Sequence, residues 1–217
     1  MCDFRRSHDE TDPEARMRKN SVATPTNVTT GRTPLWLHVV LGAGIIAFAA
    51  CVEAGMGRIA ISQSGKIQLW VGDVTSSELS QQIADWYSFS HILHGFILYA
   101  LIYWLGRGQW TLARCLVLAI AAESAWEILE NTPWVIDRYR AATASFGYTG
   151  DSILNSMCDI LFCVAGFFLA RYLPVWVTIL CVVVIELGLL WAIHDNLFLN
   201  ILMLIHPIGA IKRWQMG

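Results

Sequence analysis

Acidic residues recur at helical spacing inside apolar stretches of this 217-residue chain. Glu123 and Glu127 are four residues apart, which places both carboxylates on one face of a helix, one turn from each other. Asp151, Asn155 and Asp159 repeat this spacing further along the chain. A charged side chain at the centre of a bilayer costs roughly 2.5 to 3.5 kcal/mol on insertion scales, so such acids need a partner, water or a proton. We therefore expect them to mark a functional site.

Two histidines, His91 and His94, are three residues apart and share a helix face, a spacing that lets two imidazoles reach one metal ion. On their own they are better explained as interfacial residues that hydrogen-bond loop carbonyls or headgroups, and Glu123 and Glu127 at a similar depth are what make a shared site an equal alternative. Two carboxylates one turn apart cannot both ionise cheaply at low dielectric, so a metal, an arginine or a shared proton must intervene, unless an ion-pair network only holds helices together. The predicted ligands of a zinc, manganese or magnesium ion are His91, His94, Glu123, Glu127 and Asp159.

A divalent cation would lower the pKa of a bound water, and three carboxylates are the candidates for catalysis beside it: Glu123, Glu127 and Asp151. Arg138 is the expected counter-ion, or a bidentate fork for a substrate phosphate. Asn155 and His194 are expected to line the same cavity and contact substrate. The structural alternatives are helix capping for Asp151 and a helix-joining hydrogen bond for Asn155.

Two further acids are expected to lie outside this chemistry. Glu130 is predicted to sit at the water boundary without a special role. Glu186 stands alone in the apolar run VVVIELGLL, where a protonated acid that hydrogen-bonds across helices is the expected state.

The composition excludes an ordinary soluble domain: 55% of the residues are hydrophobic and 15% are charged, and the ten tryptophans suit the two bilayer interfaces. The bilayer is therefore the expected partner, with a lipid or lipid-linked molecule as candidate substrate and no nucleic acid. Protein partners stay open, because the net charge of −2 indicates none.

The apolar stretches predict an all-α polytopic membrane helix bundle of five firm transmembrane helices and a short sixth. Residues 1–33 are expected to be a disordered cytoplasmic tail, residues 57–87 an outer loop with a short hairpin, and residues 131–152 an ordered loop. The last span is about 24 Å long against roughly 30 Å of hydrocarbon, so a re-entrant helix broken near Pro207 is the alternative. The predicted spans are about 34–52, 89–105, 111–129, 153–172, 174–193 and 196–211.

Basic residues set the expected orientation. With six crossings, eleven Lys and Arg residues lie on the cytoplasmic side and four lie outside, so both termini are predicted to be cytoplasmic in an inner-membrane protein. The second, third, fourth and fifth spans then bring their polar residues to one depth in the outer leaflet. One polar cavity that opens outward is the economical explanation.

Four motifs resemble a family of bacterial multi-pass inner-membrane proteins known only as an uncharacterised domain: DWYSFSHILHGF, ESAWEILENTPWVIDRYR, GYTGDSILNSMCDI and HDNLFLNILMLIHP. The resemblance covers nearly everything after the tail and implies a membrane protein without an assigned activity. More distantly, Glu127, Arg138, Asp151 and Asn155 are similar to the glutamate, arginine and D-x-x-x-N pattern of VanZ-like membrane proteins, which implies envelope or lipid-linked substrates. Asp159 departs from that pattern, which tends to have a small residue there.

Together these features favour a membrane-embedded enzyme that hydrolyses or transfers a group of a lipid or lipid-linked envelope precursor at the outer leaflet. The rival is a non-enzymatic membrane protein, either a transporter with a proton relay or an accessory subunit whose polar network serves assembly. A relay should continue to the inner face. The predicted cytoplasmic loops hold no acid, which favours a one-sided site.

Overall fold

The computed structural model describes residues 33–143 and 147–216, so most of the predicted tail lies outside the described residues. Within them the fold has eight helices and no strand, which confirms the predicted all-α membrane helix bundle. In chain order the helices are α2 (Leu35–Gly55), α3 (Ser88–Leu105), α4 (Leu112–Glu130), α5 (Pro133–Ala142), α6 (Ile153–Tyr172), α7 (Val175–Ile193), α8 (Leu197–Ile205) and α9 (Gly209–Gln215).

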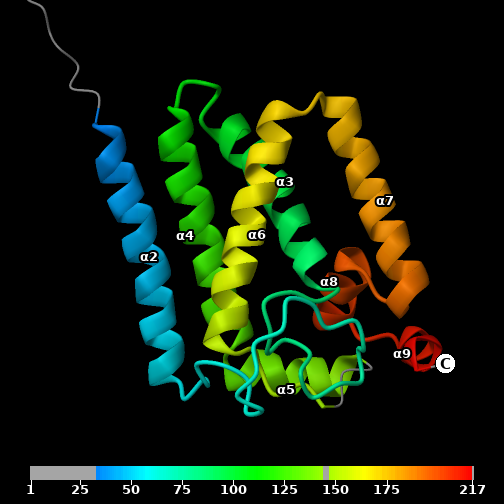
Figure 1. The fold of residues 1–217 in the computed structure, drawn as a ribbon. Helices are drawn as coiled ribbons and strands as arrows, with labels where there is room; N and C mark the ends of the chain where they lie inside the picture. Colours follow the sequence, from blue (N-terminus) through cyan, green and yellow to red (C-terminus); the bar gives the residue numbers. More distant parts are fainter. Residues whose placement is uncertain (1–32, 144–146, 217) are drawn as a thin grey trace, which may run out of the picture. The chain divides into compact units, whose positions relative to one another are not determined.

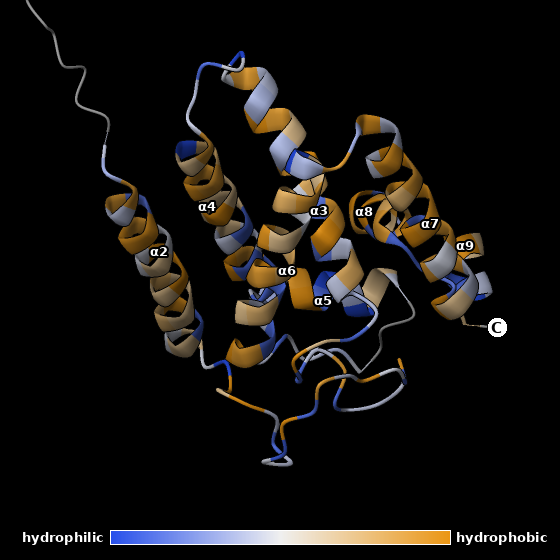
Figure 2. Ribbon diagram, turned by 45° about the horizontal axis from the view of Figure 1, so that its top comes forward, coloured by the Kyte–Doolittle hydropathy of each residue, from blue (hydrophilic) through white to orange (hydrophobic). Residues whose placement is uncertain are grey.

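Four helices, α2, α3, α6 and α7, are long and apolar enough to cross a membrane. They run side by side with α4 (Figure 1), which has 19 residues but carries three glutamates in its C-terminal half. Large apolar side chains on α2 and α7 are exposed, as at Trp36 and Trp191, and Figure 2 shows hydrophobic residues along the outer sides of these helices. Such surfaces suit contact with lipid.

The closest helix contact in the bundle joins α3 to α6. A Cβ atom at Gly95 would lie 2.1 Å from the carbonyl oxygen of Cys163, and one at Gly166 would lie 2.1 Å from that of Ile92. Small residues at such a crossing let two backbones touch. This approach fixes how the histidines of α3 face Asp159, the acid of α6.

A helix, α5, occupies part of the segment that the sequence indicated as a loop. Asn131, Thr132 and Pro133 do end α4, as the sequence predicts, but they also start the next helix. The Thr132 hydroxyl accepts a hydrogen bond from the Val135 amide, and Pro133 stands in the first turn, where its missing N–H costs nothing. Stop and start signals therefore coincide here.

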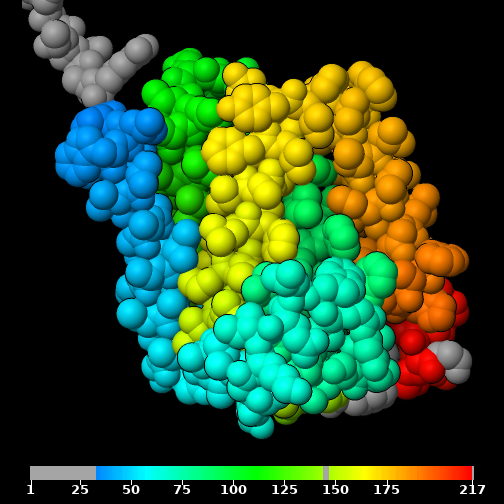
Figure 3. All heavy atoms as spheres, viewed as in Figure 1, coloured from blue at the N-terminus to red at the C-terminus, as the bar shows by residue number. Residues whose placement is uncertain are grey.

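Residues 56–87 form an irregular segment rather than the expected hairpin, because its only bridge within the described residues pairs Val71 with Asp85. Figure 3 shows this segment, in cyan, covering one end of the face formed by α3 and α6. The first amides of α6 donate to its carbonyl groups: Ser152 to Ser80 at 3.0 Å, Ile153 to Ile59 at 2.9 Å and Leu154 to Ala60 at 3.1 Å. The segment thereby closes the N-terminus of α6.

The predicted sixth segment, 196–211, is divided into two short helices. The chain breaks between α8 and α9, at His206 and Pro207, and α8 is only about 14 Å long. The side chain of Gln215 donates to Asp195 Oδ1 at 3.1 Å, so the end of α9 lies close to the start of α8. This geometry matches the re-entrant alternative, and whether the segment crosses the membrane stays a prediction. α9 lies at the end of the bundle opposite to the start of α2 (Figure 1), and the side of the membrane that holds each terminus also stays a prediction.

Glu186 stabilises the start of the re-entrant helix. Its carboxylate oxygens accept hydrogen bonds from the amides of Leu197 at 3.1 Å and Phe198 at 3.2 Å. An acid at a helix N-terminus satisfies free N–H groups and complements the helix dipole. The isolated acid in an apolar run is thus explained by helix capping, between α7 and α8.

Candidate functional site

Side chains from α3 and α4 meet at the end of the bundle where α5 lies. The Nδ1 atoms of His91 and His94 lie 2.7 Å and 2.9 Å from the same oxygen, Oε1 of Glu123. The three-residue spacing of the histidines does place them on one helix face, as the sequence predicts. Glu123 is buried, so this contact is a desolvated one.

Glu127 lies one turn further along α4 and is fully buried. Its Oε1 is 3.2 Å from His91 Nδ1, but neither of its oxygens has a hydrogen-bond partner. A buried carboxylate without partners is costly, so this group requires a proton or a cation. Two sets of side chains could each hold a metal ion, because the donor atoms within each set lie within 4.8 Å of one another. One set is His91 with His94 and Glu123, and the other is His91 with Glu127 and Glu130.

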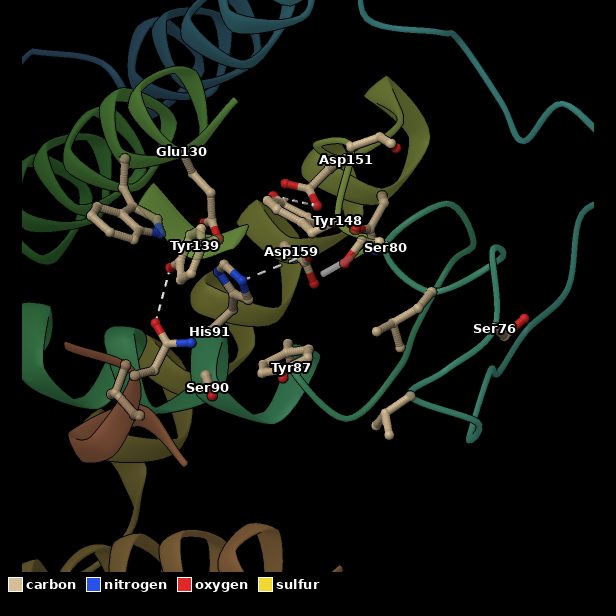
Figure 4. A pocket seen from close by; sticks show the side chains of 18 of the residues that line it. Ser76, Ser80, Tyr87, Ser90, His91, Glu130, Tyr139, Tyr148, Asp151 and Asp159 are labelled. Carbon is tan, nitrogen blue, oxygen red and sulfur yellow. Dashed lines mark hydrogen bonds and ion pairs between the residues drawn. The ribbon is translucent and has the colours of Figure 1, made fainter. Parts of the chain in front are cut away.

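Asp159 faces His91 from α6. Its Oδ1 accepts a hydrogen bond from the Ser88 hydroxyl at 3.1 Å, and its Oδ2 lies 3.9 Å from His91 Nε2 (Figure 4). If His91 donates from Nδ1 to Glu123, its Nε2 carries no proton and can accept a hydrogen bond from Asp159 only when that carboxyl is protonated. A carboxylate that accepts the N–H of an imidazole, as Glu123 then does, is the usual second contact of a metal-bound histidine.

Asp151 precedes α6 and is held by three neighbours. Its oxygens accept hydrogen bonds from Tyr148 Oη and Asn131 Nδ2, each at 3.0 Å, and its amide donates to Asn131 Oδ1 at 2.7 Å. Burial raises the pKa of the Asp151 carboxyl to about 7, although the bonds from Tyr148 and Asn131 favour the charged form. The helix cap is instead Ser152, so capping does not explain the acid.

Asn131 is a site residue that the sequence analysis missed. It is fully buried, and besides Asp151 its side chain reaches Ser156 Oγ at 3.1 Å. It thus ties the end of α4 to the start of α6. Asn155 ties the start of α6 to residues 56–87, the covering segment, because its Nδ2 donates to the carbonyl of Gln82 at 2.9 Å.

These residues border a cavity of about 440 Å³ between the segment 56–87 and helices α3 to α6 and α8. Five predicted site residues line it: His91, His94, Asp151, Asn155 and Asp159. Further lining residues were not predicted: Tyr87, Trp126, Glu130, Tyr139 and Tyr148. Glu130 therefore borders the cavity, contrary to the expectation that it has no special role. Figure 4 shows Glu130 and Tyr139 on the side of His91 away from Asp159.

Two predicted substrate-binding residues do not line this cavity. Arg138 donates from Nε to the carbonyl of Leu204 at 2.7 Å and from Nη2 to that of Ile205 at 3.1 Å, so it caps the C-terminus of α8. His194 takes a left-handed backbone conformation at the end of α7, with φ 55°, and its ring lies 5.1 Å from that of Trp214. Both side chains contact the C-terminal helices instead: Arg138 bonds the carbonyls at the end of α8, and His194 lies against Trp214 of α9.

A bundle with four membrane-length helices and a buried histidine and carboxylate cluster at one end defines a helical membrane protein with a one-sided polar site. The chain belongs to the family described as "Protein of unknown function (DUF2585)", whose model matches residues 53–217 and so includes every site residue named above. The expected membership of an uncharacterised family is confirmed, while the likeness to VanZ-like proteins stays a prediction.

Proteins named UPF0314 are similar to this chain over most of its length. The one from Sphingopyxis alaskensis is 50% identical over 84% of this chain and 95% of its own length. Those of Sinorhizobium fredii and Novosphingobium aromaticivorans are 51% and 52% identical, over 84% and 80% of this chain and 92% and 90% of their own lengths. No solved structure matches the chain.

Proposed function

We propose that this protein is a multi-pass inner-membrane enzyme that binds a divalent cation and hydrolyses or transfers a group of a lipid or lipid-linked envelope substrate at the outer leaflet. One observation carries the proposal. The buried carboxylate of Glu127 has no hydrogen-bond partner and lies beside His91, which also belongs to a second group of possible metal ligands with His94 and Glu123. A cation would satisfy a carboxylate that this fold otherwise leaves unpaired.

Imidazole and carboxylate donors without thiolates suit zinc, manganese or magnesium. When bound, such an ion lowers the pKa of a water molecule and supplies the nucleophile for hydrolysis. The ligands would come from five side chains: His91, His94, Glu123, Glu127 and Asp159. Asp151, whose pKa of about 7 lies near neutral pH, is poised to accept or donate a proton from the cavity wall.

The proposed orientation places the N-terminus in the cytoplasm and the site outside. With the C-terminal helices on the site's side, nine of the fifteen Lys and Arg residues lie inside, which still satisfies the positive-inside rule. The cavity has an apolar wall, lined by Val74, Leu79, Leu197 and Ile201, that suits the chain of a lipid. The resemblance to VanZ-like proteins that the sequence predicts would also imply an envelope substrate.

A second candidate is a non-enzymatic role, in a transporter or an accessory subunit. It is favoured by one observation: a single oxygen of Glu123 lies within hydrogen-bond distance of both histidines. Such contacts alone would hold α3 to α4 or share a proton.

Elemental analysis of the detergent-purified protein tests the proposal. We expect close to one equivalent of zinc or manganese in the wild type, lost in His94→Ala and Glu127→Gln. The matched control is Asp137→Asn, which changes an acid of α5 whose side chain is 74% exposed. A wild type that stays free of metal after incubation with each ion, while folded, would leave the non-enzymatic role as the better explanation.

A further inference from the structure

We infer that the cavity binds the positively charged amino group of an amphipathic substrate, an inference that rests on the proposed function of the same site. The sequence analysis had assigned Arg138 to an anionic headgroup. The structure places that guanidinium on the carbonyls of α8, and the chemistry of the cavity wall differs from what a phosphate requires.

The described residues of the wall include acids and two histidines but no lysine or arginine. The two other arginines near it are engaged, because Arg140 donates to the carbonyl of Tyr148 and Arg58 to that of Thr149. A phosphate would therefore find no guanidinium or ammonium partner among these side chains.

Carboxyl groups are crowded around this cavity. Three acids line it, Glu130, Asp151 and Asp159, and two more, Glu123 and Glu127, lie behind them. The other four carboxylates each disfavour the ionised form of Glu127. A positively charged ligand among these groups would favour their ionised forms and be attracted by them.

Aromatic rings complete the wall. Tyr139 and Tyr148 form an edge-to-face pair with ring centroids 5.5 Å apart, and Trp126 lies 6.0 Å from the ring of His94. Tyrosine and tryptophan faces attract ammonium groups, most strongly where water is excluded. A primary ammonium offers three donors, which the carboxylates and the hydroxyls of Ser80 and Ser90 can accept.

Apolar side chains also line the cavity. Val74 and Leu79 come from the covering segment, and Leu197 and Ile201 from α8. A molecule with an amine at one end and a hydrocarbon chain at the other matches both kinds of lining.

Native mass spectrometry of the full chain with added lipids tests the inference. Three probes share their acyl chains: phosphatidylethanolamine carries an amine, phosphatidylglycerol lacks it, and a glucosyl diacylglycerol carries a neutral sugar. We expect the wild type to retain phosphatidylethanolamine roughly tenfold better than phosphatidylglycerol, the size of one desolvated cation–aromatic contact. Asp151→Asn and Trp126→Leu should each reduce this ratio at least threefold, and Asp137→Asn should not.

Equal retention of the amine and glycerol lipids would overturn the inference, as would a preference for the sugar lipid. So would an amine preference that survives both cavity substitutions in folded protein, because binding would then lie elsewhere. Repeating the measurement after dialysis against a chelator separates the two proposals. An amine preference in protein that never binds metal contradicts only the metal-dependent function, and metal binding without the preference contradicts only this inference.

Discussion

Replacing Asn131 by alanine should destabilise the protein by several kilocalories per mole, because this amide joins two helices at the site. Its Nδ2 donates to the Glu127 carbonyl, Asp151 Oδ2 and Ser156 Oγ, and its Oδ1 accepts from the amide of Asp151. Alanine leaves that amide and the Ser156 hydroxyl in the interior without these partners. A buried polar group that loses its partner costs about 1 to 3 kcal/mol, so we expect a loss of roughly 2 to 4 kcal/mol.

The matched control is Asn200→Ala. Asn200 is also an amide beside the cavity, half-buried where Asn131 is fully buried, and its side chain accepts a hydrogen bond from Tyr139 Oη at 2.9 Å. We expect that variant to lose about 1 kcal/mol. Reversible unfolding by SDS in mixed micelles, followed by circular dichroism, measures both. If Asn131→Ala loses no more free energy of unfolding than Asn200→Ala, the view that Asn131 ties α4 to α6 is refuted.

Three further predictions concern pH, packing and topology. The Asp151 carboxyl has a folded-state pKa of about 7, above its ordinary value of 3.8. Its contribution to the free energy of unfolding is therefore full below pH 4 and is lost as the pH rises through 7. The unfolding temperature of the wild type should decrease between about pH 4 and 8, and Asp151→Asn should flatten this decrease. Gly95→Ala should lower the yield of folded, monodisperse protein, because the new methyl group would strike the backbone of α6, whereas Gly188→Ala on α7, with nothing within 4 Å, should not. In a cysteine-free background, Lys66→Cys and Gln215→Cys should both react with an impermeant reagent from the periplasmic side, and labelling from opposite sides would contradict the re-entrant α8.

Much of the fold was predictable because long apolar stretches have few alternatives to a helix in a bilayer. The short helices were not. Pro133 both ends one helix and begins the next, and the break after α8 depends on Arg138 and Glu186, which hold its two ends. These contacts join distant parts of the chain, so no local sequence pattern predicts them.

The centre of the candidate site was predictable for a similar reason. His91 with His94, and Glu123 with Glu127, share helix faces by spacing alone, and the structure brings both pairs together. The sequence analysis assigned Arg138 to the substrate, whereas its guanidinium bonds the carbonyls at the end of α8. An arginine near acids can bind a ligand or cap a helix, and its spacing in the sequence does not distinguish these two roles. The tyrosines of the cavity and Asn131 were missed because such residues are common in loops, and their importance arises only from the packing of α5 and the covering segment.

The hydrogen bonds between segment 56–87 and the start of α6 bear on how the cavity opens. Lifting the segment would strand three amides of α6 at once, at about 1 to 3 kcal/mol each for those that stay buried. Even two such losses would hold the lifted state to roughly one molecule in thirty or fewer. Exchange of amide hydrogens at the start of α6 should accordingly be slow. A ligand would then enter at the margin of α8, whose contacts with α5 are made mainly by side chains, and the covering segment would act as a fixed wall of the cavity.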